Sequence, residues 1–94
     1  MTETSFNETS INVTQNFPNP VNGTTSVRVN IEESANLSLE LTNMVGQKVL
    51  SQEKGIVNAG SHEFVLDATN LQAGIYFYTV TAGESNVTKR MIVR

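Results

Sequence analysis

Hydrophobic and polar residues alternate along most of the chain after residue 24. In SVRVNI (26–31) and NLSLELT (36–42), every second residue is aliphatic and the residues between are polar. This period of two is typical of β-strands whose alternate side chains face a core. Four later segments are also expected to be strands: KVLSQE (48–53), HEFVLD (62–67), IYFYTVTA (75–82) and VTKRMIV (87–93).

Turn-forming residues separate these segments. Gly46 in NMVGQK, the NAG triplet at 58–60 and Gly83 each lie between two predicted strands. Glycine readily adopts the positive φ angles that tight turns need. No long stretch shows the helical period of 3.6 residues. The chain is therefore predicted to be all-β, an antiparallel immunoglobulin-like β-sandwich of about seven strands.

Residues 1–16 are rich in Thr, Ser, Asn and Glu, so we expect them to be a linker from an upstream cargo protein. The folded domain is expected to span residues 17–94. Inside the linker, Ile11 and Val13 alternate with polar neighbours, which allows a short edge strand there.

The tripeptide Pro18-Asn19-Pro20 follows the linker. Proline fixes φ and has no N–H to donate to a sheet, and it disfavours the helical conformation of the residue before it. The tripeptide is therefore expected to be extended and to mark the start of the domain. Asn22-Gly23 then predicts a turn into the first long strand.

The segment DATNLQAGIYFYTV contains Leu71, Gly74 and Tyr76 in an L-x-x-G-x-Y pattern. This pattern is typical of a tyrosine corner, in which the Tyr hydroxyl bonds to backbone upstream and stabilises the sandwich. Ile75 and Phe77 lie on the opposite face of the same strand. They form an apolar patch for a partner if they are exposed, and a covered surface if they are not.

Composition excludes several functions. A net charge of −3 argues against a basic surface for nucleic acid, and the absence of cysteine excludes disulfides and thiolate zinc sites. No apolar run approaches the roughly 20 residues of a membrane helix. His62 is the only histidine and has no ligand-type neighbours in sequence, so it is expected to be a solvent-facing strand residue. We therefore predict a non-catalytic protein with no cofactor, no metal, no small-molecule substrate and no nucleic-acid partner.

The C-terminal residues TKRMIVR differ electrostatically from the rest of the chain. The last six residues contain Lys89, Arg90 and Arg94 and no acid. Lys89 shares its parity with Val87 and Met91, so alternation points this cation toward the core side. Two interpretations remain open. Lys89 is an inward lysine that protects an edge strand against aggregation, or the basic, extended C-terminus is presented to a receptor.

Four segments together resemble one family closely: FPNPVNGTTSV, LTNMVGQKV, VNAGSHEFVLDATNLQAGIYFYTV and TKRMIVR. The chain from Phe17 to Arg94 looks like the C-terminal sorting domain of type IX secretion, type A, of Bacteroidota. In NMVGQK it lacks the Asp and Arg that the family often has in a D-x-x-G-R turn. The candidate recognition residues are Pro18, Asn19, Pro20, Gly46, Gly74, Tyr76, Lys89, Arg90 and Arg94.

The resemblance implies that the chain is an export signal. Domains of this family end larger proteins, which cross the periplasm and reach the cell surface or the medium through the outer-membrane type IX translocon. A surface sortase commonly removes the domain, and the cut is expected before Phe17. The implied partners are thus the upstream cargo, the translocon and the sortase. The alternative is an immunoglobulin- or fibronectin-like accessory module that binds glycan or protein, although the absence of Trp disfavours a sugar platform.

Overall fold

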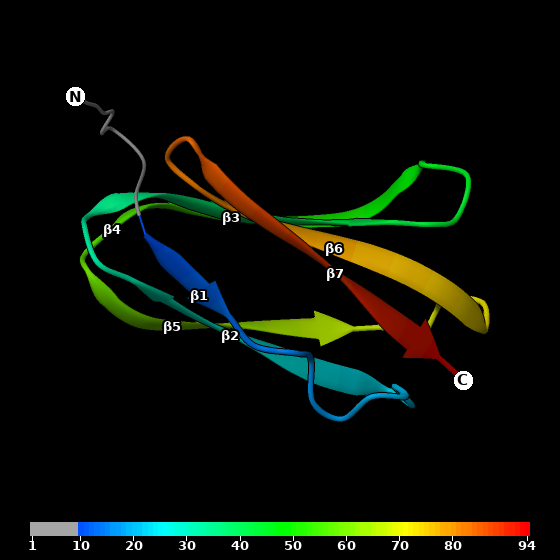
Figure 1. Ribbon diagram of the computed structural model, residues 1–94. Coiled ribbons are helices and arrows are strands. Elements are labelled where there is room, and N and C mark those ends of the chain that lie inside the picture. Colours follow the sequence, from blue (N-terminus) through cyan, green and yellow to red (C-terminus); the bar gives the residue numbers. More distant parts are fainter. Residues whose placement is uncertain (1–9) are drawn as a thin grey trace.

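The computed structural model describes residues 10–94, which form two antiparallel sheets packed face to face (Figure 1). The three-stranded sheet has the order β1 (Ile11–Val13), β2 (Thr24–Ile31), β5 (Gly60–Asp67). The four-stranded sheet has the order β4 (Lys48–Val57), β3 (Ala35–Thr42), β6 (Gly74–Ala82), β7 (Ser85–Val93). The predicted all-β sandwich is confirmed. No helix long and apolar enough to cross a membrane occurs in residues 10–94.

The core lies between the two sheets. Eight aliphatic and aromatic side chains on the inward face of three strands are buried: Val27, Val29 and Ile31 in β2, Leu37, Leu39 and Leu41 in β3, and Phe64 and Leu66 in β5. Burial of one such side chain contributes about 1.5–3 kcal/mol of transfer free energy. Because each strand commits only one face to this core, the alternating residues fix which face of each sheet is inside.

Strand β1 lies at the edge of the three-stranded sheet, so the short edge strand allowed by the sequence is confirmed. It pairs with β2 in a register that places Ile11 opposite Ile31 and Val13 opposite Val29. Val13 is 6% exposed and belongs to the core. The segment expected to be a linker thus contributes a strand to the sandwich.

Two other expectations are resolved by the positions of the strands. Because β6 lies between β3 and β7, its outer residues Ile75 and Phe77 are flanked on both sides and are only half-buried. The expectation that His62 faces solvent is wrong. Its side chain shares the inward face of β5 with Phe64 and is half-buried, and its ring Nε2 lies 2.7 Å from the carbonyl oxygen of Asn58.

On one side of the sandwich, the outer edges of β4 and β5 meet. The side chain of Gln52 in β4 donates a hydrogen bond of 2.8 Å to the carbonyl oxygen of Val65 in β5. Lys54 in β4 places its ammonium group 5.0 Å from the centre of the Phe64 ring. A bridging amide and an inward cation oppose the addition of a foreign strand at this side.

Leu39→Ala tests the core. Leu39 is completely buried, so the substitution is expected to lower the free energy of unfolding by about 2–5 kcal/mol through lost contacts and a residual cavity. Urea denaturation followed by circular dichroism measures this loss. Ile56→Ala is the control, since Ile56 is 78% exposed, and it should change the free energy by about 0.5 kcal/mol or less. Equal losses in both variants would contradict the assigned core.

Candidate functional site

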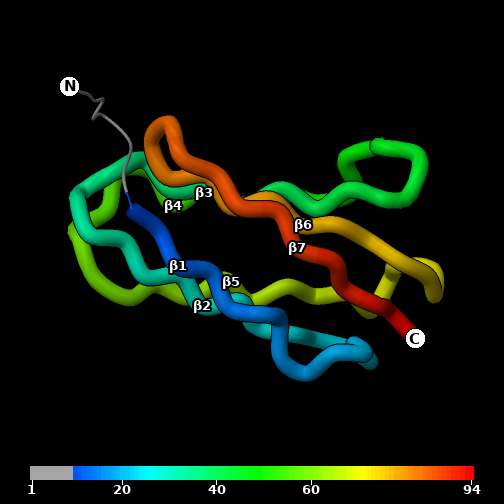
Figure 2. Tube along the Cα trace, in the orientation of Figure 1, coloured from blue at the N-terminus to red at the C-terminus, as the bar shows by residue number. Residues whose placement is uncertain are grey.

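The N-terminal arm, which we define as residues 14–21, leads from β1 to the turn before β2. It runs along the side of the sandwich where the edges of β2 and β7 lie near each other (Figure 2). On the β2 side, Phe17 and Ser26 exchange two backbone hydrogen bonds of 2.9 Å, and the Thr14 N–H donates to the Arg28 carbonyl at 2.9 Å. The arm therefore continues the pairing that β1 begins.

On its other side, the arm is bonded to the last residues of β7. The Ile92 N–H donates to Asn19 Oδ1 at 3.0 Å, and the Val21 N–H donates to the Ile92 carbonyl at 2.7 Å. The Arg94 N–H donates to the Val21 carbonyl at 2.9 Å, and Gln15 Nε2 donates to the Arg90 carbonyl at 2.7 Å. The proline-flanked Asn19 and the C-terminal residues, which lie far apart in sequence, thus form one hydrogen-bonded unit.

A buried polar group anchors the arm to the interior. The Asn16 N–H donates to the Tyr78 hydroxyl at 2.9 Å, and that hydroxyl donates to the Thr14 carbonyl at 2.9 Å. The Asn16 side chain donates to Thr25 Oγ1 and to the Pro18 carbonyl, both at 3.1 Å. Asn16 and Thr25 are each 2% exposed. Because buried polar groups are costly when unpaired, these bonds hold the arm in one position.

The sequence did not predict this anchor. Asn16 was assigned to the linker, and nothing in the local pattern distinguishes it from the exposed Asn12 or Asn22. Its partner Tyr78 is 62 positions away in the chain. Burial raises the pKa of the Tyr78 hydroxyl, and its hydrogen bond with the Asn16 backbone partly opposes this rise.

The expectation that Pro18-Asn19-Pro20 is extended is wrong. The chain bends through these three residues, and the peptide bonds that precede both prolines are cis. The bend brings the Pro18 carbonyl back to Thr25 Oγ1, which donates to it at 2.9 Å. Asn19 points its amide oxygen toward β7. The tripeptide therefore shapes the arm and lies outside both sheets.

The predicted tyrosine corner is present at the start of β6. The Tyr76 hydroxyl donates a 2.7 Å hydrogen bond to the Gln72 carbonyl, four residues upstream. Tyr76 is 7% exposed, and Gly74 has a positive φ. The Ala68 N–H donates to the Gly23 carbonyl at 2.8 Å, which joins this corner to the turn after the arm. The buried Tyr76 stabilises the corner and offers little surface to a partner.

Asp67 begins the same corner. Its carboxylate accepts hydrogen bonds from the Thr69 hydroxyl and from the Thr69 N–H, the latter at 3.0 Å. These bonds hold the pKa of Asp67 below its ordinary value. The carboxylate is thus occupied by the turn.

The loop between β3 and β4 is organised by Asn43. Asn43 Oδ1 accepts hydrogen bonds from the N–H groups of Val45 and Gln47, at 3.1 and 2.9 Å. Gly46 has a φ of 87°, as predicted for the turn glycine. The amide oxygen of Asn43 makes the hydrogen bonds expected of an Asp or Asn side chain at the start of a turn. The loop therefore keeps its shape although Asn43 stands where the D-x-x-G-R turn of the family has Asp. Its tip exposes Met44 (66%) and Val45 (80%).

Four segments meet at one end of the sandwich, which we call the distal end: residues 17–23, 43–47, 68–74 and 92–94 (Figure 1). A hollow of about 340 Å³ lies between the second and third of these segments. It is lined by Asn43, Met44, Val45, Gln72, Ala73, Gly74, Ile75 and Tyr76. The distal end therefore combines an open hollow with exposed apolar side chains.

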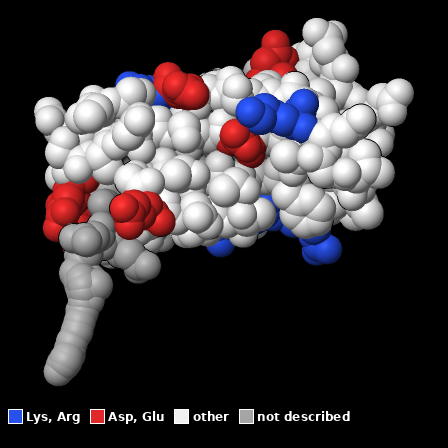
Figure 3. Space-filling view, turned by 90° about the horizontal axis from the view of Figure 1, so that it is seen from above, with Lys and Arg blue, Asp and Glu red and all other residues white. Residues whose placement is uncertain are grey.

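Charge is distributed unequally between the two ends. Arg94 is the one charged residue among the four segments of the distal end. The turns at the opposite, proximal end contain Glu32, Glu33 and Glu84 and no basic residue. In the view from above, acidic side chains lie at the proximal end and also near the middle of the molecule, where a basic group stands beside them (Figure 3). A partner that covers the distal end therefore desolvates few charges.

The sequence-predicted candidates are only partly brought together. The distal end contains Pro18, Asn19, Pro20, Gly46, Gly74 and Arg94, and Tyr76 borders its hollow. Lys89 and Arg90 lie within β7 on opposite faces, Lys89 half-buried on the inward side and Arg90 exposed opposite Phe77. The basic C-terminus is thus a strand of the sheet, and its cations do not form one cluster.

Comparison with known proteins agrees with this geometry. Residues 15–94 match the profile of a family described as a secretion system C-terminal sorting domain. Because this match covers most of the chain, the chain belongs to the C-terminal sorting domains of type IX secretion, a non-catalytic family whose members act as secretion signals. A comparison with curated proteins found no similar sequence.

Tyr78→Phe tests the buried anchor. The substitution keeps the ring but leaves the Asn16 N–H and the Thr14 carbonyl without this partner. The free energy of unfolding at neutral pH is expected to fall by about 1–3 kcal/mol. Tyr76→Phe, which removes a single hydroxyl contact, should cost about 0.5–1.5 kcal/mol. A Tyr78→Phe variant as stable as the parent would contradict the anchor.

The free energy of unfolding is also expected to depend on pH differently in the parent and in Tyr78→Phe. Because the pKa of Tyr78 is raised in the folded state, the neutral hydroxyl contributes stability that is complete below its ordinary value of 10.0. This stability is lost as the pH rises through the folded pKa. Urea unfolding at neutral and strongly alkaline pH should therefore show the parent losing more stability than Tyr78→Phe.

Asn19→Ala tests the bond between the arm and β7. Removal of Asn19 Oδ1 leaves the Ile92 N–H without its acceptor, so hydrogen exchange at Ile92 is expected to accelerate about 2- to 12-fold, equivalent to about 0.5–1.5 kcal/mol. Amide exchange followed by NMR measures this. Asn22→Ala, in the turn just after the arm, is the control and should leave Ile92 unchanged. Equal exchange in both variants would show that Asn19 does not hold the C-terminal residues.

Proposed function

We propose that this chain directs an upstream cargo protein through the type IX translocon, and that the distal end is the surface presented to the outer-membrane machinery. The observation that carries the proposal is the convergence of the four distal segments, which include most of the residues singled out by the family resemblance. No catalytic step is required of the chain, since its role is to be recognised.

The position of the upstream chain supports this orientation. Ser10 lies beside the start of the β2–β3 turn, where the Glu32 N–H donates to its carbonyl at 3.2 Å. The chain therefore enters the sandwich at the proximal end, and β1 carries it toward the distal end (Figure 2). A cargo domain attached upstream would leave the distal end uncovered. Such a cargo would cross the periplasm and then stay on the cell surface or enter the medium.

The pairing of β1 and the arm with the rest of the sandwich limits where a sortase could cut the chain. The residues from Ile11 to Val21 are paired with β2 and β7, and Asn16 is buried. A protease needs an accessible, unpaired segment, so we place the sortase cut and the functional boundary of the sorting domain before Ile11. This position narrows the expected cut, which the sequence placed anywhere before Phe17. The type A subclass is part of the same proposal.

We assign the contact with the translocon to the hollow at the distal end and its exposed rim. Met44 and Val45 contribute apolar surface from the β3–β4 loop, and Gly74 and Ile75 line the facing wall. Arg94 supplies an exposed cation at the distal end, where its backbone N–H is bonded to the Val21 carbonyl. The proposed partner surface is apolar with an acidic flank. Its apolar part would pack against Met44 and Val45, and its acidic part would attract Arg94.

Val45→Ser tests this assignment. Residues 10–94 are fused to a reporter that carries a periplasmic signal peptide, in a host with type IX secretion, and surface display is measured. Val45 is 80% exposed, so its loss leaves the fold intact, while the lost apolar contact is expected to reduce display several-fold. Ile56→Ser is the matched control at 78% exposure and should display normally.

Two results would decide against the proposal. Retention of the folded parent fusion in the periplasm would refute the export function itself. Normal display of Val45→Ser together with the parent would leave export standing and remove the hollow from the recognition surface.

A further inference from the structure

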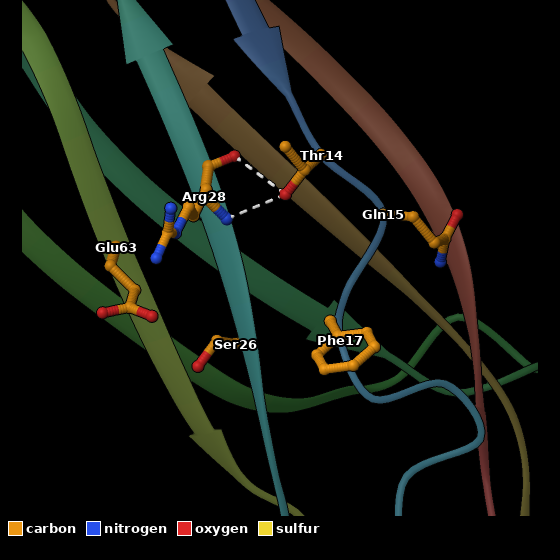
Figure 4. Close-up of a pocket in the computed structure, with 6 residues that line it drawn as sticks. All are labelled: Thr14, Gln15, Phe17, Ser26, Arg28 and Glu63. Carbon is orange, nitrogen blue, oxygen red and sulfur yellow. Dashed lines mark hydrogen bonds between the residues drawn. The ribbon is translucent and has the colours of Figure 1, made fainter.

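The outer face of the three-stranded sheet carries a second surface, away from the distal hollow. Three hollows on this face share Arg28 in their lining. The largest has a volume of about 360 Å³ and is lined by Thr14, Gln15, Phe17, Ser26, Arg28 and Glu63 (Figure 4). We call these three neighbouring hollows together the Arg28 groove and define it by Phe17, Ser26, Arg28, Asn30, Ser61 and Glu63.

The two charged residues of the groove lie next to each other without a direct ion pair between them. Arg28 in β2 and Glu63 in β5 are cross-strand neighbours in the register, and their side chains lie side by side in Figure 4. Nevertheless, the one ion pair in residues 10–94 joins Lys48 to Glu40, at 3.2 Å. The guanidinium donors of Arg28 and the carboxylate acceptors of Glu63 therefore remain available to a ligand.

An aromatic ring stands at one end of the groove. Phe17 is 80% exposed, yet its backbone is fixed by two hydrogen bonds with Ser26. The next residue along the groove, Arg28, has its backbone N–H bonded to Thr14 Oγ1 at 3.0 Å. An exposed phenyl ring on a fixed backbone contributes little to the core and offers an apolar face to solvent.

The chemistry of these groups selects one class of ligand. An anion would be attracted by Arg28 and repelled by Glu63. A cation would be attracted by Glu63 and repelled by Arg28. A neutral polyhydroxylated molecule donates to Glu63, accepts from Arg28, and also bonds the hydroxyl and amide groups of Ser26, Asn30 and Ser61. The C–H face of a sugar ring packs on an aromatic ring such as Phe17. The volume of the largest hollow falls in the range of about 300–1,000 Å³ typical of ligand sites.

We propose that the Arg28 groove binds a neutral oligosaccharide, with Phe17 as the stacking platform and Arg28 and Glu63 as the groups that orient the sugar hydroxyls. This binding is independent of export, because the groove lies on the sheet opposite the one that carries the distal hollow. It gives the sandwich a surface that holds glycan while the distal hollow remains free.

The test is a titration of the complete chain, followed by amide NMR shifts, with cellotetraose, maltotetraose, the anionic tetragalacturonate and a Ser-Val-Thr-Val-Ser peptide. At least one neutral tetrasaccharide is expected to shift Ser26, Arg28, Ser61 and Glu63. Phe17→Ala and Glu63→Gln should each weaken this binding about tenfold or more, the loss of roughly one charged hydrogen bond or one stacked ring. Ile56→Ala and Glu53→Gln, exposed positions on β4, are the matched controls and should bind as the parent does.

Three outcomes would overturn the proposal. The first is the absence of shifts with both neutral tetrasaccharides. The second is tighter binding of tetragalacturonate that survives Glu63→Gln, which would make the groove an anion site of Arg28. The third is a response to the peptide alone, which would make this face a protein-binding surface. None of these outcomes depends on whether the chain supports export.

Discussion

The hydrogen bond between the Asn16 backbone and the Tyr78 hydroxyl ties the N-terminal arm to the interior of the four-stranded sheet. Without this tie, the arm would be an exposed connection between β1 and β2. With it, the arm lies between the edges of β2 and β7 and can bond to both. The position of Asn19 against Ile92, the covered end of β7 and the exposed ring of Phe17 all follow from that placement.

The arm also covers part of one edge of the sandwich. The side where β4 meets β5 is bridged by Gln52 and screened by Lys54. The opposite side is covered along the last residues of β7 by the arm, which satisfies outward backbone groups from Arg90 to Arg94. Covered edges disfavour aggregation, because open strands can pair with strands of other chains.

The sandwich separates its surfaces by end and by face. Antiparallel strands bring alternate turns to the same end, so the acidic turns gather near the upstream chain and the nearly uncharged segments gather at the distal end. The Arg28 groove lies mainly on the outer face of the sheet formed by β1, β2 and β5 and reaches the distal end at Phe17. The hollow that we propose for the translocon and the groove that we propose for glycan therefore lie on opposite sheets, and the hollow lies away from the end where the chain enters the sandwich.

Much of the fold could be predicted from the sequence, because the strands depend on the local alternation of hydrophobic and polar residues. The alternation of Val27, Val29 and Ile31 with polar residues predicted a strand with one buried face, and Gly46 predicted a turn. Both predictions depend only on residues that are close together in the sequence. The L-x-x-G-x-Y pattern likewise predicted the corner, because Tyr76 bonds to backbone only four residues away. The ordered motifs also identified the family.

Tertiary structure decided what depends on residues distant in the chain. The burial of Asn16 and the bend at Pro18-Asn19-Pro20 both contradicted local expectation. Each reflects a neighbour supplied by another strand or by the turn that returns the chain. Lys89 and Arg90 were adjacent in sequence but lie on opposite faces of β7, whereas Asn19 and Ile92 were distant and became bonded. Sequence fixes the period of each strand, but the partners across the sandwich appear only when long-range packing selects one arrangement for all of them.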